Sequence, residues 1–146
     1  ETTRDGRVRS ILSQERTDAR THSLDLYQQE IPAGGRSGKH WHMADEAVYV
    51  ISGSGNSLQW DVEADIDDRY YARIAKEPTR WDFSAGDLVY VPQNTVHQLI
   101  NTGREPLVVL VAQNRLFKLL GYDSVVHLED APDLAGKDRA AVTAGS

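Results

Sequence analysis

The chain has 146 residues, of which 40% are apolar and 26% charged, with a net charge of −6 at pH 7 and no cysteine. This length suits one domain with a single sizeable core. The negative charge argues against non-specific binding to nucleic acid or to anionic membranes, and the absence of cysteine excludes disulfides, iron–sulfur clusters and thiol catalysis. No apolar run approaches the roughly 20 residues of a membrane span. No signal peptide is visible, so the expected location is the cytoplasm.

The chain opens with a polar, arginine-rich segment, residues 1–21, in which few side chains can pack. We expect there an arm lying across a partner subunit or a loosely ordered tail. Residues 22–128 form the predicted domain, which begins with an alternating strand over residues 23–31. Residues 129–146 are small and polar and predict a frayed C-terminal tail.

Residues 34–53 contain two of the five histidines, one residue apart. Because side chains alternate between the two faces of a strand, His40 and His42 point to the same side. Glu46 lies a further even step along and rejoins that side if residues 43–45 turn tightly. A β-rich run follows, so these three side chains are candidates for one common site.

Residues 54–85 form a longer connection than a hairpin needs. Its acidic part, residues 61–68, predicts a solvated loop, because an EF-hand loop there would need glycine and glutamate where the chain has Ile66 and Ala72. Strands are expected on either side of this loop, over residues 58–60, 70–75 and 79–83.

The next stretch that carries a candidate site residue starts at Gly86 and consists of a short strand, a turn and a second extended run. The alternation of this run places His97 and Leu99 on one face. Residues 107–112 are the clearest buried strand. Residues 116–120 predict a short helix, which Gly121 ends.

Two hairpins facing each other across a sandwich or small barrel would bring the histidine of the second stretch to the three polar side chains of the first. Neutral imidazoles and one carboxylate suit iron, manganese, nickel, copper, cobalt or zinc. Four ligands on a six-coordinate ion leave about two positions for water, substrate or dioxygen, whereas a structural zinc site is more often rich in thiolates. The predicted mononuclear metal centre consists of His40, His42, Glu46 and His97.

Both stretches resemble the two sequence motifs of the cupin superfamily. The first fits G-x5-H-x-H-x3-E-x6-G at every defined position, and the second fits G-x5-P-x-G-x2-H-x3-N except at Asn94, where the family usually has glycine. Asparagine tolerates a positive φ better than most residues, so the ligand assignment stands. The resemblance covers residues 22–115 and implies an all-β fold: a double-stranded β-helix (jelly-roll) barrel with a short C-terminal helix packed outside. It also implies a homodimer.

The resemblance implies three kinds of function. The first is an oxidoreductase, above all a dioxygenase, that holds one divalent metal and acts on a small organic substrate; the aromatic side chains of the long connection favour an aromatic one. Iron(II) is the first expectation, with manganese, nickel, copper, cobalt or zinc as alternatives. The second is a redox-neutral lyase, isomerase or decarboxylase in which the metal polarises a carbonyl. The third is a small-molecule-binding module without catalysis.

Side chains beyond the four ligands give less specific signals. An apolar wall would keep water from reactive intermediates, and its candidates are Val48, Val50, Val89, Val91 and Leu99. The long connection carries aromatic and arginine side chains that are more typical of a core or an interface than of a pocket: Trp60, Tyr70, Tyr71, Arg73, Arg80 and Trp81. A lyase would need a base, for which the candidates are Tyr49, Tyr90, His22 and His127, the last more typical of a surface histidine.

Overall fold

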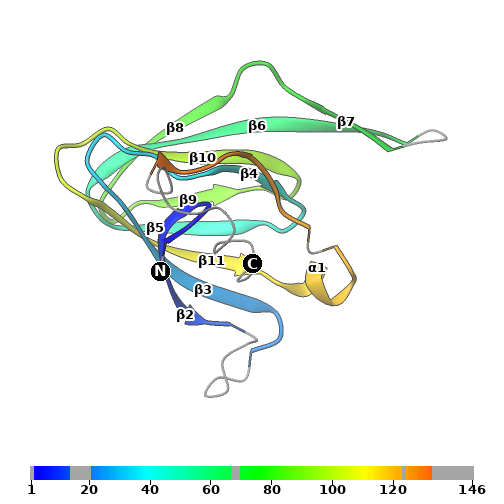
Figure 1. Cartoon of the computed structure of the whole chain (residues 1–146), viewed down its shortest axis with the longest axis horizontal. Helices are drawn as coiled ribbons and strands as arrows, with labels where there is room; N and C mark the ends of the chain where they lie inside the picture. Colours follow the sequence, from blue (N-terminus) through cyan, green and yellow to red (C-terminus); the bar gives the residue numbers. More distant parts are fainter. Residues whose placement is uncertain (1, 14–20, 67–69, 123, 133–146) are drawn as a thin grey trace.

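Two antiparallel β-sheets pack face to face in the computed structural model of the chain, which describes residues 2–13, 21–66, 70–122 and 124–132 (Figure 1). The first sheet has the order β1-β2-β3-β11-β5-β9, and the second has the order β12-β4-β10-β6-β7, with β8 also paired to β6. Neighbouring strands run antiparallel in both sheets. The prediction of an all-β jelly-roll barrel is confirmed.

The strands differ in length from two to thirteen residues. The first sheet consists of β1 (Thr2–Thr3), β2 (Gly6–Leu12), β3 (Leu24–Ile31), β5 (Glu46–Ser52), β9 (Leu88–Val91) and β11 (Leu107–Asn114). The second sheet consists of β4 (Lys39–His42), β6 (Ser54–Ile66), β7 (Tyr70–Ile74), β8 (Thr79–Ser84), β10 (Thr95–Asn101) and β12 (Val126–Glu129).

The hydrophobic core lies between the two sheets. Along β5 and β11, buried side chains alternate with more exposed ones, as the period of two in a strand requires. Branched valine side chains fit this pleated surface, and burying one such side chain fully contributes about 1.5–3 kcal/mol. The core is formed by Ile31, Val48, Val50, Phe83, Val89, Val91, Leu99, Leu107, Val109 and Val111. It includes the predicted apolar wall and the predicted buried strand at residues 107–112.

Strand register brings the two predicted histidine stretches together. In the second sheet, β10 pairs with β4 so that His97 lies opposite His40 and Thr95 lies opposite His42. Glu46 comes from β5 of the facing sheet, where it starts the strand directly after the turn at residues 43–45. Each stretch thus crosses from one sheet to the other, so the expectation of two facing hairpins is wrong, and the two sheets supply the site from opposite sides.

The turn between β9 and β10 has the backbone conformation that its sequence predicts. Asn94 has a φ of +57° and is the only non-glycine residue with a positive φ among the described residues. Its side-chain oxygen accepts a hydrogen bond from Nε1 of Trp41 at 2.8 Å, which ties the turn to β4. Asparagine therefore replaces the usual glycine and adds a contact that glycine lacks.

Residues 2–12 do not form a loosely ordered tail, whereas residues 14–20 lie outside the described part and an arm across a partner subunit stays a prediction. Residues 2–12 form β1 and β2, and β2 pairs with β3 of the same chain. Its arginines find partners on that neighbour, since Arg7 lies 3.3 Å from Glu30 and Arg9 donates to the Gln28 side chain at 3.0 Å. Polar side chains on both strands explain why a composition argument missed this pairing.

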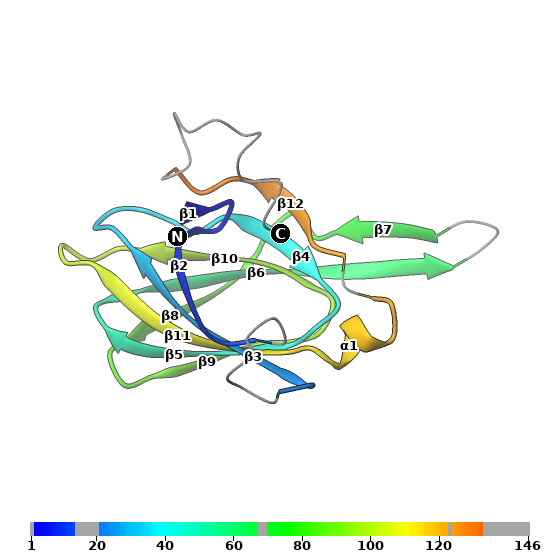
Figure 2. The ribbon, with the colours of Figure 1, turned by 60° about the horizontal axis from the view of Figure 1, so that its bottom comes forward.

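The acidic segment also differs from its prediction as a loop. Strand β6 continues to Ile66 and pairs with β7, and the two strands extend as a ribbon beyond the rest of the sandwich (Figure 2). The alternation of exposed Asp61, half-buried Val62 and exposed Glu63 is a strand pattern. Counting acidic residues hid that pattern, and residues 67–69 lie outside the described part.

The predicted helix is present as α1 (Leu116–Leu119), and Gly121 follows it with a φ of +82°. It lies beyond the end of β11, with Leu116 and Leu119 exposed. Of the predicted C-terminal tail, Glu129 ends β12 and Ala131 is buried, whereas residues 133–146 lie outside the described part. Among the described residues, no helix is both long and apolar enough to cross a membrane.

Candidate metal centre

The structure brings the four predicted ligands together inside the barrel. His40, His42, Glu46 and His97 are all buried, and each offers a ligand atom within 4.8 Å of those of the other three. Strands β4 and β10 supply the histidines, and β5 supplies the carboxylate. The rings of His42 and His97 are nearly perpendicular, with centroids 4.9 Å apart. These four side chains thus surround one small volume.

The spacing of the ligand atoms fits a metal ion. Oε2 of Glu46 lies 3.3 Å from Nε2 of His42, and Oε1 lies 3.1 Å from Nε2 of His97. Two atoms bound to one transition metal by bonds of about 2.1 Å lie roughly 3.0–3.4 Å apart. The two Nε2 atoms and Oε2 are buried and make no hydrogen bond within the described residues. Buried polar atoms without partners are costly, and a metal ion would satisfy all three.

The opposite side of each ring shows which nitrogen is available. Nδ1 of His42 lies 2.8 Å from the carbonyl oxygen of Ala44, and Nδ1 of His97 lies 2.9 Å from that of Thr95. A carbonyl only accepts, so Nδ1 donates in both rings, and Nε2 carries no proton when the ring is neutral. This arrangement is typical of histidines that bind a metal through Nε2.

Mutual electrostatics set the protonation of the cluster. Burial alone would raise the pKa of Glu46, but the imidazoles of His97 and His42 outweigh burial and hold this pKa well below its usual range. Burial lowers the pKa of His97, but the Glu46 carboxylate and the Thr95 carbonyl more than offset this and raise it above 6.5. Burial and the neighbouring His97 lower the pKa of His40. A metal would therefore compete with a proton held between Glu46 and His97.

A cavity of about 320 Å³ lies against the centre on the side of His42. Its walls are almost wholly apolar, and they come from β4, the turn after it, the segment before β12 and the first residue of β12. The lining residues are Trp41, His42, Met43, Tyr122, Ser124 and Val126. A small organic molecule with an apolar body fits such walls, and His42 belongs both to this lining and to the four-residue cluster.

None of the described aromatic and arginine side chains of the long connection belongs to the four-residue cluster or lines the cavity. Trp60 is buried beneath the ammonium group of Lys39, which lies 4.0 Å from its ring centroid. Arg80 pairs with Asp82 at the surface, and Trp81 is 54% exposed. Arg73 lies beside Glu63 on the ribbon, and the side chains of Tyr70 and Tyr71 lie outside the description. The C-terminal segment, and not this connection, walls the cavity beside the metal site.

The four candidate bases have different surroundings. Tyr49 and Tyr90 are exposed on the outer face of the first sheet, and the Tyr90 hydroxyl donates to Asp45 at 2.8 Å. His22 is exposed. For His127 the expectation of a surface histidine was wrong: its side chain is 11% exposed, and β12 places it opposite His40.

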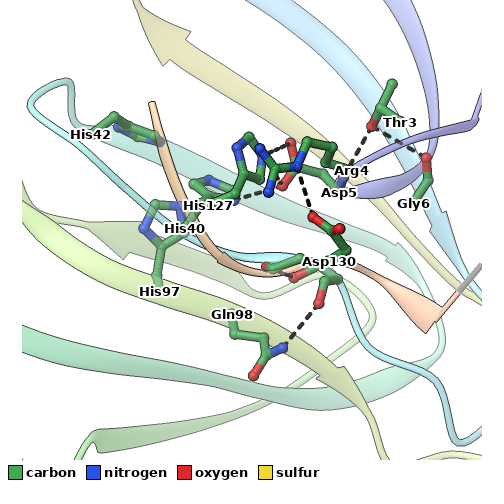
Figure 3. Close-up of polar contacts among 12 residues, drawn as sticks. Thr3, Arg4, Asp5, Gly6, His40, His42, His97, Gln98, His127 and Asp130 are labelled. Atoms are coloured by element: carbon green, nitrogen blue, oxygen red, sulfur yellow. Dashed lines mark hydrogen bonds and ion pairs between the residues drawn. The ribbon is translucent and has the colours of Figure 1, made fainter. Parts of the chain in front are cut away.

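Two further residues near the centre carry no clear sequence signal. Asp5 lies in the turn before β2, with Oδ1 2.7 Å from Nδ1 of His40 (Figure 3). The Asp5-Gly6 pair is a turn signal, but nothing local links it to a histidine strand. Tyr27 packs against the core from β3, and burial, then the charge of Glu46, raise the pKa of its hydroxyl well above 10.0. Its hydroxyl therefore stays protonated at neutral pH.

These observations define the class: a small antiparallel β-barrel whose interior holds three imidazoles and one carboxylate in an arrangement that fits a metal. Comparison with known proteins agrees, because residues 2–115 match the family described as Cupin. The chain belongs to the cupin family.

Three similar proteins share 20–26% sequence identity with this chain. Auxin-binding protein 1 of Arabidopsis thaliana is 26% identical over 92 residues, which are 63% of this chain and 42% of that protein. A structure of Bacillus subtilis oxalate decarboxylase, from work on its Mn(II) centres, has a TM-score of 0.59 at 23% identity, covering 85% of this chain and 28% of the other. A cupin 2 conserved barrel domain protein from Salinispora arenicola has a TM-score of 0.51 at 20% identity, covering 73% of each chain. This chain thus spans less than half the length of the first two, and the structural matches show the fold alone.

Proposed function

We propose that this protein is a metal-dependent oxidoreductase, and specifically a dioxygenase, that acts on a small organic molecule with an apolar body. The observation that carries the proposal is the junction of two features at His42. This residue belongs to the four-ligand cluster and also lines the apolar cavity. A molecule held in the cavity would therefore present one end to the metal site.

The ligand set would be formed by Nε2 atoms of histidines and the Glu46 carboxylate, a donor set that suits iron(II) first and also manganese, nickel, copper, cobalt or zinc. A divalent metal held by four protein ligands supplies redox and Lewis-acid chemistry at its remaining positions. The Mn(II) centres of oxalate decarboxylase, a protein of the same fold, make manganese the main alternative to iron.

The surrounding side chains would exclude water and orient the substrate. Valine side chains from β5 and β9 and Leu99 from β10 close the barrel interior beneath the site. Such an apolar lining protects reactive intermediates from side reactions. Trp41, Met43 and Val126 would hold the apolar part of the substrate by contact and burial. The four buried ligands would be kept rigid by their strands and by the Nδ1 hydrogen bonds.

A redox-neutral decarboxylase is the second candidate, and Tyr27 is the observation that favours it. Burial and the charge of Glu46 raise the pKa of its hydroxyl, so Tyr27 would act as a hydrogen-bond donor to a substrate carboxylate and not as an acid. The surface positions of Tyr49, Tyr90 and His22 do not support the bases expected from the sequence. A small-molecule-binding module without turnover is the third candidate, in line with the name of the Arabidopsis relative.

The test begins with elemental analysis of protein purified without added metal. The metal-loaded protein is then screened with small aromatic and hydroxy-acid compounds, and oxygen uptake is compared with product formation in air and without oxygen. A dioxygenase stops without oxygen, whereas a decarboxylase continues. The variant His97→Ala should lose metal and turnover, and His22→Ala, at an exposed histidine away from the cluster, should keep both. If His97→Ala keeps metal and turnover, the proposal is wrong.

A further inference from the structure

The N-terminal hairpin reaches the metal centre through a single carboxylate. Asp5 lies between β1 and β2, and its Oδ1 is 2.7 Å from Nδ1 of His40. His42 and His97 direct the same nitrogen to backbone carbonyls. Among the three histidines of the centre, His40 is thus the one whose outer nitrogen faces a charged side chain.

The spacing identifies this contact as a support for a ligand and not as part of a second metal site. Asp5, His40 and His127 also lie close enough together to be considered as ligands of a cation. However, the 2.7 Å between Asp5 and His40 is shorter than the roughly 3.0–3.4 Å expected for two atoms on one metal. It matches the length of a charged contact between an imidazole nitrogen and a carboxylate, about 2.7–2.9 Å, and the two atoms form an ion pair without the geometry of a hydrogen bond.

Asp5 is held in place from its own backbone. Its carbonyl oxygen accepts a hydrogen bond from Nε2 of Gln29 at 2.6 Å, and its N–H donates to Oγ1 of Thr3 at 3.1 Å. Gly38 on the approach to β4 leaves room for the turn, because a Cβ atom there would lie 2.6 Å from the Arg4 carbonyl oxygen and 2.7 Å from Oδ1 of Asp5. The two backbone hydrogen bonds of Asp5 and the close approach of Gly38 therefore fix the position of the carboxylate.

The C-terminal strand closes the other side of the carboxylate. Nε2 of His127 lies 3.3 Å from Oδ1 and 3.4 Å from Oδ2 of Asp5. Next to it, Arg4 pairs with Asp130 at 2.7 Å (Figure 3). The Ala131 N–H donates to the Arg4 carbonyl at 2.8 Å. The two ends of the described chain thus meet behind His40.

We propose that Asp5 is the positioning residue of the metal centre: it orients the His40 ring and strengthens its Nε2 as a ligand, while His127 orients Asp5. The inference rests on the proposed metal site. A carboxylate behind a metal-binding histidine fixes the ring and its tautomer and makes the ring a stronger donor, and its loss typically weakens metal affinity about 10- to 100-fold. The N-terminal hairpin then belongs to the metal centre as well as to the sheet.

The experiment measures Co²⁺ binding to metal-free wild type, Asp5→Asn and Glu30→Gln by titration, together with the absorption spectrum of each saturated protein. Glu30→Gln is the matched control, because it removes one negative charge from β3 opposite the same hairpin, at an exposed position away from His40. We expect Asp5→Asn to bind Co²⁺ about 10- to 100-fold more weakly with an altered spectrum. Glu30→Gln should match the wild type in both.

Melting temperatures of the metal-free proteins separate positioning from a purely structural role. A structural role alone would lower the melting temperature of Asp5→Asn and leave its Co²⁺ affinity and spectrum unchanged, and this result would overturn the inference. If Asp5→Asn fails to fold, the test uses His127→Gln, which leaves the carboxylate in place. This variant should lose less Co²⁺ affinity than expected for Asp5→Asn, and an unchanged affinity overturns the inference. If the wild type itself binds no Co²⁺, the metal site fails and the inference with it, whereas equal binding by wild type and Asp5→Asn refutes the inference alone.

Discussion

The exchange of Glu46 for glutamine tests whether the four-residue cluster binds a metal as one unit. Glutamine keeps the volume and one acceptor oxygen of the side chain but removes the negative charge. Glu46 is 5% exposed, and its carboxylate lies within 3.3 Å of the Nε2 atoms of both His42 and His97. It is the single anionic member of the predicted ligand set, so its charge should dominate the attraction for a divalent cation.

The expected size of the effect follows from the number of ligands. Structural zinc sites with four ligands bind with about 10–16 kcal/mol, so an even share is about 2.5–4 kcal/mol per ligand. This share corresponds to a Kd that is roughly 100- to 1,000-fold weaker. The expected loss exceeds the loss at Asp5, because Glu46 would contact the metal itself and Asp5 would act through His40.

The assay is Co²⁺ titration of metal-free wild type and Glu46→Gln, followed by absorption and calorimetry. The control is Glu77→Gln, which removes the same charge from an exposed position outside the cluster. A correctly folded Glu46→Gln protein with wild-type Co²⁺ affinity would refute the ligand assignment. A drop of equal size in Glu77→Gln would show that net charge, and not coordination, controls binding.

Three further predictions concern protons, a buried amide and a turn. Because the pKa of His97 is raised above 6.5, metal affinity should rise with pH between about pH 6 and pH 8, and a flat profile in calorimetry would contradict this. Asn101→Ala removes a buried side chain that bonds three backbone carbonyls and one N–H. Urea titration should show a free energy of unfolding that is lower by about 3 kcal/mol, and a loss of less than about 1 kcal/mol would show that those bonds are dispensable. Asn94→Val should destabilise by about 1–3 kcal/mol through its positive φ. Asn94→Gly should cost less in the same assay, and equal losses would exclude backbone strain as the cause.

The alternation of side chains made the ligand positions predictable. His40 and His42 share a face because they are two residues apart in a strand, and the turn at residues 43–45 returns Glu46 to the same interior. The backbone of Asn94 was predictable for a different reason: it stands where the family motif usually has glycine, and few other residues tolerate a left-handed turn. These features depend on local geometry, which a single sequence carries directly.

Predictions from composition were less successful. The acidic stretch continues β6, because exposed carboxylates on one face are compatible with strand pairing. The arginine-rich start of the chain pairs with β3, since exposed polar side chains do not prevent a backbone ladder. In both cases the average polarity of a segment described its solvent exposure and not its hydrogen bonding.

The sequence by itself determined the barrel, its core strands and the four side chains that converge in its interior, because these follow from a period of two and from motifs that each span two consecutive strands. Only the tertiary structure decided what lies behind them. His127 meets Asp5 across a separation of 122 residues, and His40 gains its carboxylate partner from a hairpin that no local pattern connects with it. Such contacts depend on which strands become neighbours, and neighbouring strands are chosen by the folding of the whole chain.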